Sequence, residues 1–307
     1  MNAKWICPAV TPFQPNENPS APLEIDFESA GRLYENLIAN DIDGVLIGGS
    51  LGEFFGQTLK QREELAKFAV KQIAGRMQVI IGTANMIAEE IAPLSNACLD
   101  AGADAVMIVP PFYFSFSDKE MYDFYSRMAK EIHGPVYLYN FPDRTGYTIS
   151  PIVVRRLSEE YENIVGIKDT ISGMDHTREL IKAVKPIRPD FEIFSGFDDN
   201  FAHNVLSGGD GAICGFSNVA PKICTDWVKA VRANDLELSA VYHQKINRCM
   251  DVYSIGAPFV PYVKEACRQC GWISSAACTF PIPNLDAAER AKVTAFLVRE
   301  GLIEATS

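Results

Sequence analysis

The sequence predicts a (β/α)₈ barrel of the α/β class, a TIM barrel, with a helical extension at its C-terminal end. Short apolar runs rich in valine and isoleucine recur along about 220 residues. Segments with the apolar spacing of amphipathic helices separate these runs. We count roughly eight predicted buried strands that alternate with helices, and a (β/α)₈ barrel requires eight.

The apolar runs are continuous rather than alternating, which is typical of parallel strands that are covered on both faces. They are residues 5–10, 44–48, 78–82, 105–109, 136–139, 164–167, 192–195 and 211–215. A doubly wound open sheet is the alternative, but it usually has fewer strands and a glycine-rich phosphate loop after the first. Here Thr11-Pro12-Phe13 follows the first run, without that loop.

Helical periodicity lies between the runs and continues after them. Among the strands we expect helices at 27–38, 59–73 and 87–101. After Pro221 the strand signals stop, and we expect further helices at 223–233, 236–252, 259–270 and 285–300. The predicted division is therefore a barrel over residues 1–221 and a C-terminal helical region, 222–307, packed on it.

Composition excludes several functional classes. A formal net charge of -11 argues against a surface for nucleic acid or anionic membranes, which needs clustered Lys and Arg. The chain has no apolar stretch long enough to span a bilayer, and its first residues do not resemble a signal peptide. Eight cysteines without regular spacing suit a reducing compartment. We expect a soluble, cytoplasmic protein.

Lys168 ends one of the predicted buried strands, and a polar loop, 169–173, follows it. Burial favours the free amine of a lysine, and a free amine can attack a ketone. The alternative is a strand-end lysine that reaches solvent. The residues at the other strand ends favour the reactive interpretation.

In a (β/α)₈ barrel the active site forms where the carboxyl ends of the strands meet the following loops. The residues at these ends include Thr11, Ser50, Thr83, Tyr113, Tyr139, Lys168, Asp198, Asp199 and Ser217. The amine of Lys168, the tyrosine phenols and the serine and threonine hydroxyls would thus lie together at one end of the barrel. Such a set is suited to imine chemistry, in which an amine attacks and a phenol moves protons.

Simpler explanations exist for several of these residues. The loop Gly48-Gly49-Ser50-Leu51-Gly52 is either a tight turn or a set of backbone N–H groups that grips a carboxylate. Tyr139 could be an ordinary strand aromatic, and Arg144 a solvated loop charge. Glu53 could simply occupy the first turn of a helix, where a negative charge is favourable.

Metal chemistry has little support in the sequence. The four histidines show no paired ligand spacing. Cys267-Arg268-Gln269-Cys270 is a single CxxC within a helical pattern, without the second pair that zinc sites use. We expect no metal and no separate cofactor.

Three motifs together resemble the dihydrodipicolinate synthase and N-acetylneuraminate lyase superfamily of pyruvate-type class I aldolases. They are Gly49-Ser50-Leu51-Gly52-Glu53, Tyr139-Asn140-Phe141-Pro142 and Gly166-Ile167-Lys168-Asp169. The resemblance extends in order from Val10 to Pro221, and further helices follow, as in that family.

By this resemblance, Lys168 forms a Schiff base with the ketone of pyruvate or a 2-keto acid, so the covalent imine replaces a cofactor. Tyr139 moves protons, and the Ser50 hydroxyl hydrogen-bonds to it. The Ser50 and Leu51 amides bind the carboxylate of the keto acid. Tyr113 completes the proton relay across a subunit interface. The resemblance also implies a homotetramer built as a dimer of dimers.

Other positions in the resemblance concern the substrate. Leu51 replaces the second hydroxyl residue of the synthase branch, whereas Arg144 matches its carboxylate-binding arginine. Residues 196–199, which include Gly196, Asp198 and Asp199, resemble the acidic stretch with which sialate lyases hold sugar hydroxyls. Gly215 replaces a serine of that branch and, with Phe216, is expected near the substrate.

The resemblance therefore favours cleavage, or dehydration, of a 2-keto-3-deoxy sugar acid, with pyruvate and an aldehyde as the products of cleavage. The alternatives are the dihydrodipicolinate synthase reaction, a sugar-acid dehydratase and a sialate-type lyase. A catalytically silent barrel that senses sugar acids is an alternative of a different class.

Overall fold

The computed structural model describes residues 1, 3–16 and 22–305. Its strands form a closed parallel barrel in chain order, and the last strand pairs with the first. The strands are β1 (Lys4–Pro8), β2 (Gly44–Ile47), β3 (Gln78–Gly82), β4 (Ala105–Ile108), β5 (Val136–Asn140), β6 (Ile164–Asp169), β7 (Glu192–Ser195) and β8 (Gly211–Ile213). This confirms the predicted (β/α)₈ class.

Helices follow the strands around the barrel. They are α1 (Phe27–Ala39), α2 (Leu59–Ile73), α3 (Ile91–Asp100), α4 (Asp118–Glu131), α5 (Pro142–Thr145), α6 (Pro151–Glu160), α7 (Asp175–Val184), α8 (Phe201–Leu206) and α9 (Pro221–Arg232). Short 3₁₀ helices accompany them: η1 (Phe54–Gly56), η2 (Ala88–Glu90), η3 (Asp198–Asn200) and η4 (Gly215–Asn218).

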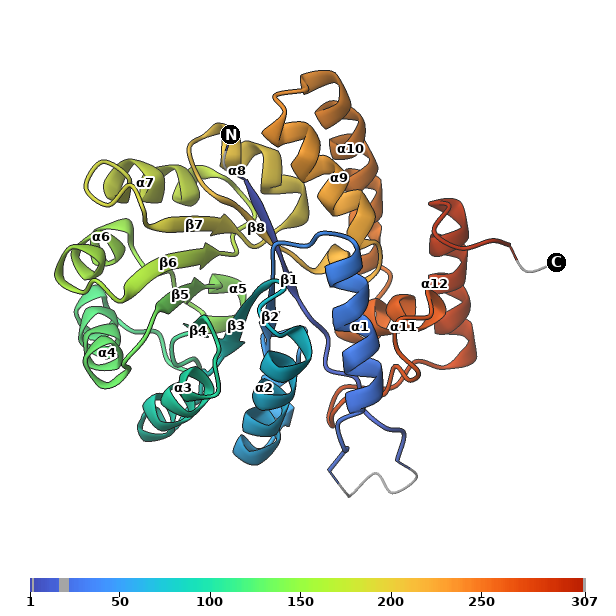
Figure 1. Cartoon of the computed structure of the whole chain (residues 1–307), viewed down its shortest axis with the longest axis horizontal. Coiled ribbons are helices and arrows are strands. Elements are labelled where there is room, and N and C mark those ends of the chain that lie inside the picture. The colour runs from blue at the N-terminus through green and yellow to red at the C-terminus, as the bar shows by residue number, and fades with distance from the viewer. Residues whose placement is uncertain (2, 17–21, 306–307) are drawn as a thin grey trace.

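A C-terminal helical part completes the chain, as predicted. It comprises α10 (Leu236–Cys249), η5 (Met250–Tyr253), α11 (Val260–Gln269) and α12 (Ala287–Arg299). These helices lie on the side of the barrel where β1 and β8 meet (Figure 1). The proposed division at residues 221 and 222 stays a prediction, and residues 306 and 307 of that region lie outside the described part.

Local sequence signals account for the starts of several helices. At the start of α2, Thr58 and Gln61 form a reciprocal capping box, and Ser117 and Glu120 do the same for α4. The eighth strand was predicted to reach residue 215 but ends at Ile213, because the chain turns into η4 there.

The continuous apolar character of the strands follows from burial on both faces. Side chains such as Ile6, Leu46, Ile80 and Phe194 fill the barrel interior, where they contact one another. Alternate residues face outward into two larger clusters beneath the helices. The packed interior leaves the carboxyl ends of the strands as the place where a site can open.

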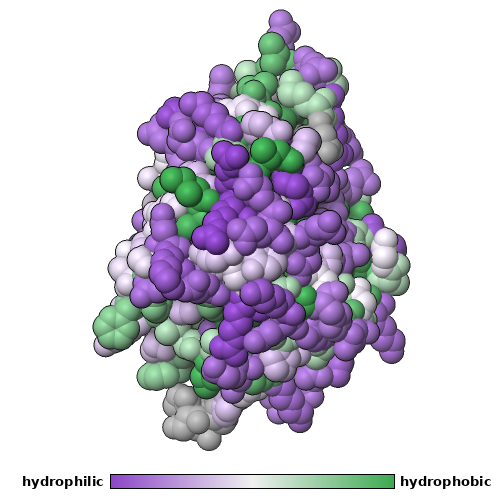
Figure 2. Space-filling view, turned by 90° about the vertical axis from the view of Figure 1, so that its left-hand side faces the viewer, coloured by the Kyte–Doolittle hydropathy of each residue, from purple (hydrophilic) through white to green (hydrophobic). Residues whose placement is uncertain are grey.

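None of the helices in the described ranges is long and apolar enough to cross a membrane. Figure 2 shows the face on the left of Figure 1, where α4, α6 and α7 lie. This face is mostly hydrophilic, and its hydrophobic residues form small separate groups.

Candidate active site

A cavity of about 200 Å³ opens at the carboxyl ends of the barrel strands. Its volume is below the range typical of sites for drug-sized ligands, so it suits a small metabolite. Eight of the predicted site residues line it: Ser50, Leu51, Tyr139, Arg144, Lys168, Gly196, Asp198 and Gly215. Tyr113, Asp199 and Phe216 do not.

Lys168 and Tyr139 are direct neighbours on paired strands. Tyr139 of β5 is the register partner of Lys168 of β6, and both side chains point into the barrel mouth. The Lys168 Nζ lies 4.4 Å from the centre of the tyrosine ring, and both residues are buried. No carboxylate in the described part of the chain pairs with Lys168, so its nitrogen is available for covalent chemistry.

A hydrogen-bond network lies behind these two residues, on the outer face of the same strands. The Asp169 carboxylate accepts bonds from Asn140 (2.7 Å) and Thr177 (2.6 Å), and it contacts Nδ1 of His176 at 3.0 Å. The other ring nitrogen of His176 lies 3.0 Å from the carbonyl oxygen of Ile149. The network thereby fixes the residues that follow Lys168 and Tyr139 in sequence.

The His176 ring is placed between two acceptors, which favours its doubly protonated form. Burial, the largest influence, lowers the pKa of His176. The hydrogen bond and charge of Asp169, together with the Ile149 carbonyl, outweigh burial, so that this pKa lies above its ordinary value.

The loop after β2 turns sharply at Gly48, whose φ of 70° is costly for other residues. The Thr11 hydroxyl donates to the Gly52 carbonyl at 2.8 Å and fixes the far end of the turn. Within the described ranges, the Ser50 and Leu51 amides donate to no acceptor, and no hydrogen bond joins Ser50 to Tyr139. Two free amides in one turn are suited to a carboxylate.

Glu53, at the end of this loop, has a structural role that the sequence did not indicate. Its side chain is fully buried, and its Oε1 lies 2.7 Å from the Nζ of Lys264 on α11. Its Oε2 accepts the backbone N–H of Thr279 at 2.7 Å and the Thr279 hydroxyl at 2.9 Å. The C-terminal helical part therefore holds the loop that carries Ser50 and Leu51.

Asp198 is the buried carboxylate of the cavity, with 2% of its surface exposed. Its Oδ1 accepts the Phe216 backbone N–H at 3.0 Å, and its Oδ2 accepts the Tyr253 hydroxyl at 2.9 Å. Burial raises the pKa of Asp198 to about 6, although these hydrogen bonds oppose the rise. Asp199 lies outside the cavity lining.

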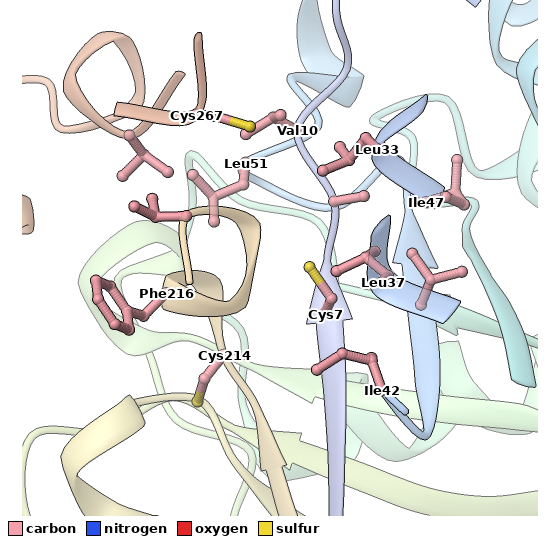
Figure 3. Close-up of a cluster of buried hydrophobic side chains, with 14 of the residues drawn as sticks. Cys7, Val10, Leu33, Leu37, Ile42, Ile47, Leu51, Cys214, Phe216 and Cys267 are labelled. Atoms are coloured by element: carbon pink, nitrogen blue, oxygen red, sulfur yellow. The ribbon is translucent and has the colours of Figure 1, made fainter. Parts of the chain in front are cut away.

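Leu51 and Phe216 belong to the hydrophobic core around the cavity. Figure 3 shows Leu51 between the segments that carry Val10, Phe216 and Cys267, within one cluster of buried side chains. Leu51 also lines the cavity. The side chain of Phe216 lies in the core, and only its backbone N–H contacts the site, by donating to Asp198. The apolar residue at position 51 is therefore a packed wall of the site.

Arg144 lies at the mouth of the cavity on α5, which Pro142 begins. Its guanidinium lies 5.2 Å from the centre of the Phe141 ring. The side chain is exposed, and no carboxylate within the described ranges forms an ion pair with it. Arg144 is thus available to a polar or anionic ligand.

Tyr113 lies apart from the cavity in the single chain. It is 86% exposed and packs edge-to-face on Phe114, with ring centres 5.0 Å apart. Its φ of 95° is unusual for a residue with a side chain, and such strain is often found at functional positions.

The lining residues that were not predicted at the site include Thr170, Met250, Tyr253 and Phe259. The Thr170 hydroxyl is buried and has no hydrogen-bond partner within the described residues. Strand alternation could have indicated it, because Thr170 follows Lys168 by two residues and shares its face. The other three come from the C-terminal helical part, for which no local signal existed.

Comparison with known proteins decides the family. The model of the dihydrodipicolinate synthetase family matches residues 2–300. The chain belongs to this family. The dihydrodipicolinate synthetase family comprises lyases that act on 2-keto acids through a Schiff base, and the chain is such a class I aldolase or lyase.

Solved structures of the dihydrodipicolinate synthetase family superpose closely on the chain. The structure of YagE from Escherichia coli K12 in complex with pyruvate has a TM-score of 0.93 at 34% identity, and covers 98% of this chain and 99% of that one. A dihydrodipicolinate synthase from Aquifex aeolicus has a TM-score of 0.89 at 28% identity, with 98% of each chain covered.

Relatives of the chain in this family are named for different activities. The putative 2-dehydro-3-deoxy-D-gluconate aldolase YagE of Escherichia coli is 35% identical, with 89% of this chain and 91% of that protein covered. A 4-hydroxy-tetrahydrodipicolinate synthase of Kosmotoga olearia is also 35% identical, with 92% of each covered. Identity alone therefore does not select the substrate.

Proposed function

We propose that the protein cleaves a 2-keto-3-deoxy sugar acid to pyruvate and an aldehyde by a retro-aldol reaction. The observation that carries this proposal is the composition of the cavity beyond Lys168. The lining there includes the Asp198 carboxylate, the Tyr253 phenol that donates to it, and the Thr170 hydroxyl, which has no partner among the described residues. These groups suit a chain of hydroxyl groups rather than a second carboxylate.

In the proposed reaction, the Lys168 amine attacks the C2 ketone, and water leaves as the protonated imine forms. The Ser50 and Leu51 amides hold the C1 carboxylate. Tyr139 removes the proton of the C4 hydroxyl, the C3–C4 bond breaks, and the electron pair passes through C3 to the imine nitrogen as an enamine. The aldehyde leaves, C3 takes up a proton, and hydrolysis releases pyruvate and restores the amine.

The protonated imine is the electron sink of this reaction, so we propose that no separate cofactor takes part. Tyr113 is proposed to reach the site of a neighbouring subunit in a homotetramer, a dimer of dimers, which its exposure and its distance from its own cavity support. A cytoplasmic location is proposed because all eight cysteines are free.

The synthase reaction is the second candidate, and Arg144 favours it. This exposed arginine at the cavity mouth has no ion-pair partner in the described part of the chain, so it could bind the carboxylate of a second substrate, aspartate semialdehyde. Leu51 argues against it, because a leucine replaces the second hydroxyl of the synthase loop. Dehydration of the same sugar acids and sialate cleavage are further variants of the imine mechanism.

A substrate panel tests the proposal. The purified protein is incubated with 2-keto-3-deoxy-hexonates and pentonates, with N-acetylneuraminate, and with pyruvate plus aspartate semialdehyde. We expect pyruvate release from one or more of the 2-keto-3-deoxy acids, with the matching aldehyde as co-product. Pyruvate consumption with aspartate semialdehyde alone would assign the protein to the synthase branch instead.

A further inference from the structure

Tyr253 brings a phenol from the C-terminal helical part into the cavity. It ends η5 and donates its hydroxyl proton to Asp198 Oδ2 at 2.9 Å. The other oxygen of Asp198 is held by the Phe216 backbone N–H at 3.0 Å. Both carboxylate oxygens are therefore engaged, and the direction of the phenol proton is fixed.

Two neighbours limit the position of Tyr253. Phe259 packs against its ring edge-to-face, with ring centres 5.7 Å apart. Gly215 lies close to its hydroxyl, and an added Cβ there would come within 2.7 Å of that hydroxyl and 2.6 Å of Leu51 Cδ1. The glycine at position 215 is thus what leaves room for the phenol beside Asp198.

This arrangement determines which chemical group the phenol can meet. Its single proton is committed to Asp198, so toward the cavity the phenol oxygen can only accept a hydrogen bond. A ligand hydroxyl can donate that bond, whereas a methylene group or a carbonyl oxygen cannot. A buried acceptor left without a donor is costly, which makes the contact selective.

We propose that Tyr253 is a specificity-determining residue that selects an aldehyde half bearing a hydroxyl group. This inference rests on the proposed retro-aldol function and names the part of the substrate that the C-terminal helical part recognises. Asp198 positions the phenol, and Gly215 provides its space. Burial raises the pKa of Asp198 to about 6, so at neutral pH the group is a carboxylate that accepts the phenol proton.

The test runs the reaction in the direction of addition, with pyruvate and either D-glyceraldehyde or propanal. Pyruvate consumption gives kcat/KM for each aldehyde. We expect the unmodified protein to prefer glyceraldehyde, and Tyr253→Phe to lower the ratio of the two values about tenfold, the value of one hydrogen bond. The loss should fall on glyceraldehyde and leave propanal nearly unaffected.

The matched control is Tyr262→Phe, which removes a phenol that donates to Glu289 at 2.8 Å outside the cavity. This variant should keep the glyceraldehyde preference. Gly215→Ala serves as a second route, because its methyl group would displace the Tyr253 hydroxyl and should lower the ratio in the same direction. It also keeps the test decisive if Tyr253→Phe fails to fold.

An unchanged ratio in both Tyr253→Phe and Gly215→Ala, or no preference in the unmodified protein, overturns the inference. Borohydride trapping of pyruvate on Lys168 is measured in the same samples, and it distinguishes failure of the Tyr253 role from failure of the proposed function. A trapped adduct with an unchanged ratio refutes the role of Tyr253 alone. The absence of any adduct refutes the proposed function itself.

Discussion

The Glu53 carboxylate and the Lys264 ammonium form an ion pair at 2.7 Å in which both side chains are fully buried. The two residues are 211 positions apart in sequence. The pair joins the loop of Ser50 and Leu51, whose amides are proposed to bind the substrate carboxylate, to α11 of the C-terminal helical part. A site formed by the barrel strands is therefore held in place by helices outside the barrel.

Loss of this pair should destabilise the fold. Lys264→Met leaves the Glu53 carboxylate buried without its counter-ion, and breaking such a pair costs about 3–5 kcal/mol. The free energy of unfolding in urea measures the effect. Lys229→Met is the control, because it breaks an exposed pair with Asp41 of similar length and should leave the free energy of unfolding nearly unchanged. Equal stability of the two variants would contradict the role assigned to Lys264.

Tyr139→Phe should retain the imine site and lose turnover. Removal of a general acid or base lowers kcat by roughly 10²- to 10⁴-fold. Tyr137→Phe is the matched control on the same strand, because that phenol bonds to Glu192 away from the cavity. A near-normal rate in Tyr139→Phe, measured as pyruvate release, would assign proton transfer to another group.

Arg144→Ala should weaken binding of the second substrate half and leave trapping of pyruvate on Lys168 intact. A charge-assisted hydrogen bond from Arg144 would contribute roughly 10- to 100-fold in KM. Steady-state kinetics with varied aldehyde or semialdehyde measure it. Arg155→Ala, which removes an exposed arginine paired with Glu159 on α6, is the control. An unchanged KM would show that Arg144 contacts solvent and not the substrate.

The raised pKa of Asp198 predicts a pH dependence of stability. Burial shifts this pKa from 3.8 to about 6, so the folded state holds the proton more tightly than the unfolded state. The stability from this group is therefore complete below pH 4, and it is lost as pH rises to 6, by about 3 kcal/mol. Asp198→Asn lacks this titration.

The measurement is the difference in unfolding free energy between the unmodified protein and Asp198→Asn at several pH values. The unmodified protein should lose stability relative to the variant between pH 4 and pH 6. A difference that stays constant over this interval would show that Asp198 titrates normally.

Features that depend on neighbouring residues in sequence were predicted correctly. β6 begins as a short apolar run and continues through Lys168 to Asp169, and the length and apolar character of the run identify a buried strand. The chain topology then brings its carboxyl end beside that of β5, so strand order places Lys168 near Tyr139. Their direct pairing also depends on the register shift between Val136 and Tyr137, which strand order does not predict.

Features that depend on contacts between distant segments could not be predicted. Lys264 lies in a helix whose polar residues would normally face solvent, and nothing near it in sequence indicates Glu53 as its partner. The position of Tyr253 depends in the same way on how η5 packs over the barrel mouth. Phe216 was expected at the substrate, but its side chain packs in the core, because only the backbone of η4 turns toward Asp198.

The central claim is that the Lys168 amine condenses with the ketone of pyruvate, and borohydride reduction tests it most directly. After incubation with pyruvate and reduction, the digested protein is examined by mass spectrometry. We predict that the peptide bearing Lys168 carries one reduced pyruvate, and that Lys168→Ala carries none. An unmodified Lys168, or an adduct on another lysine, would contradict the account.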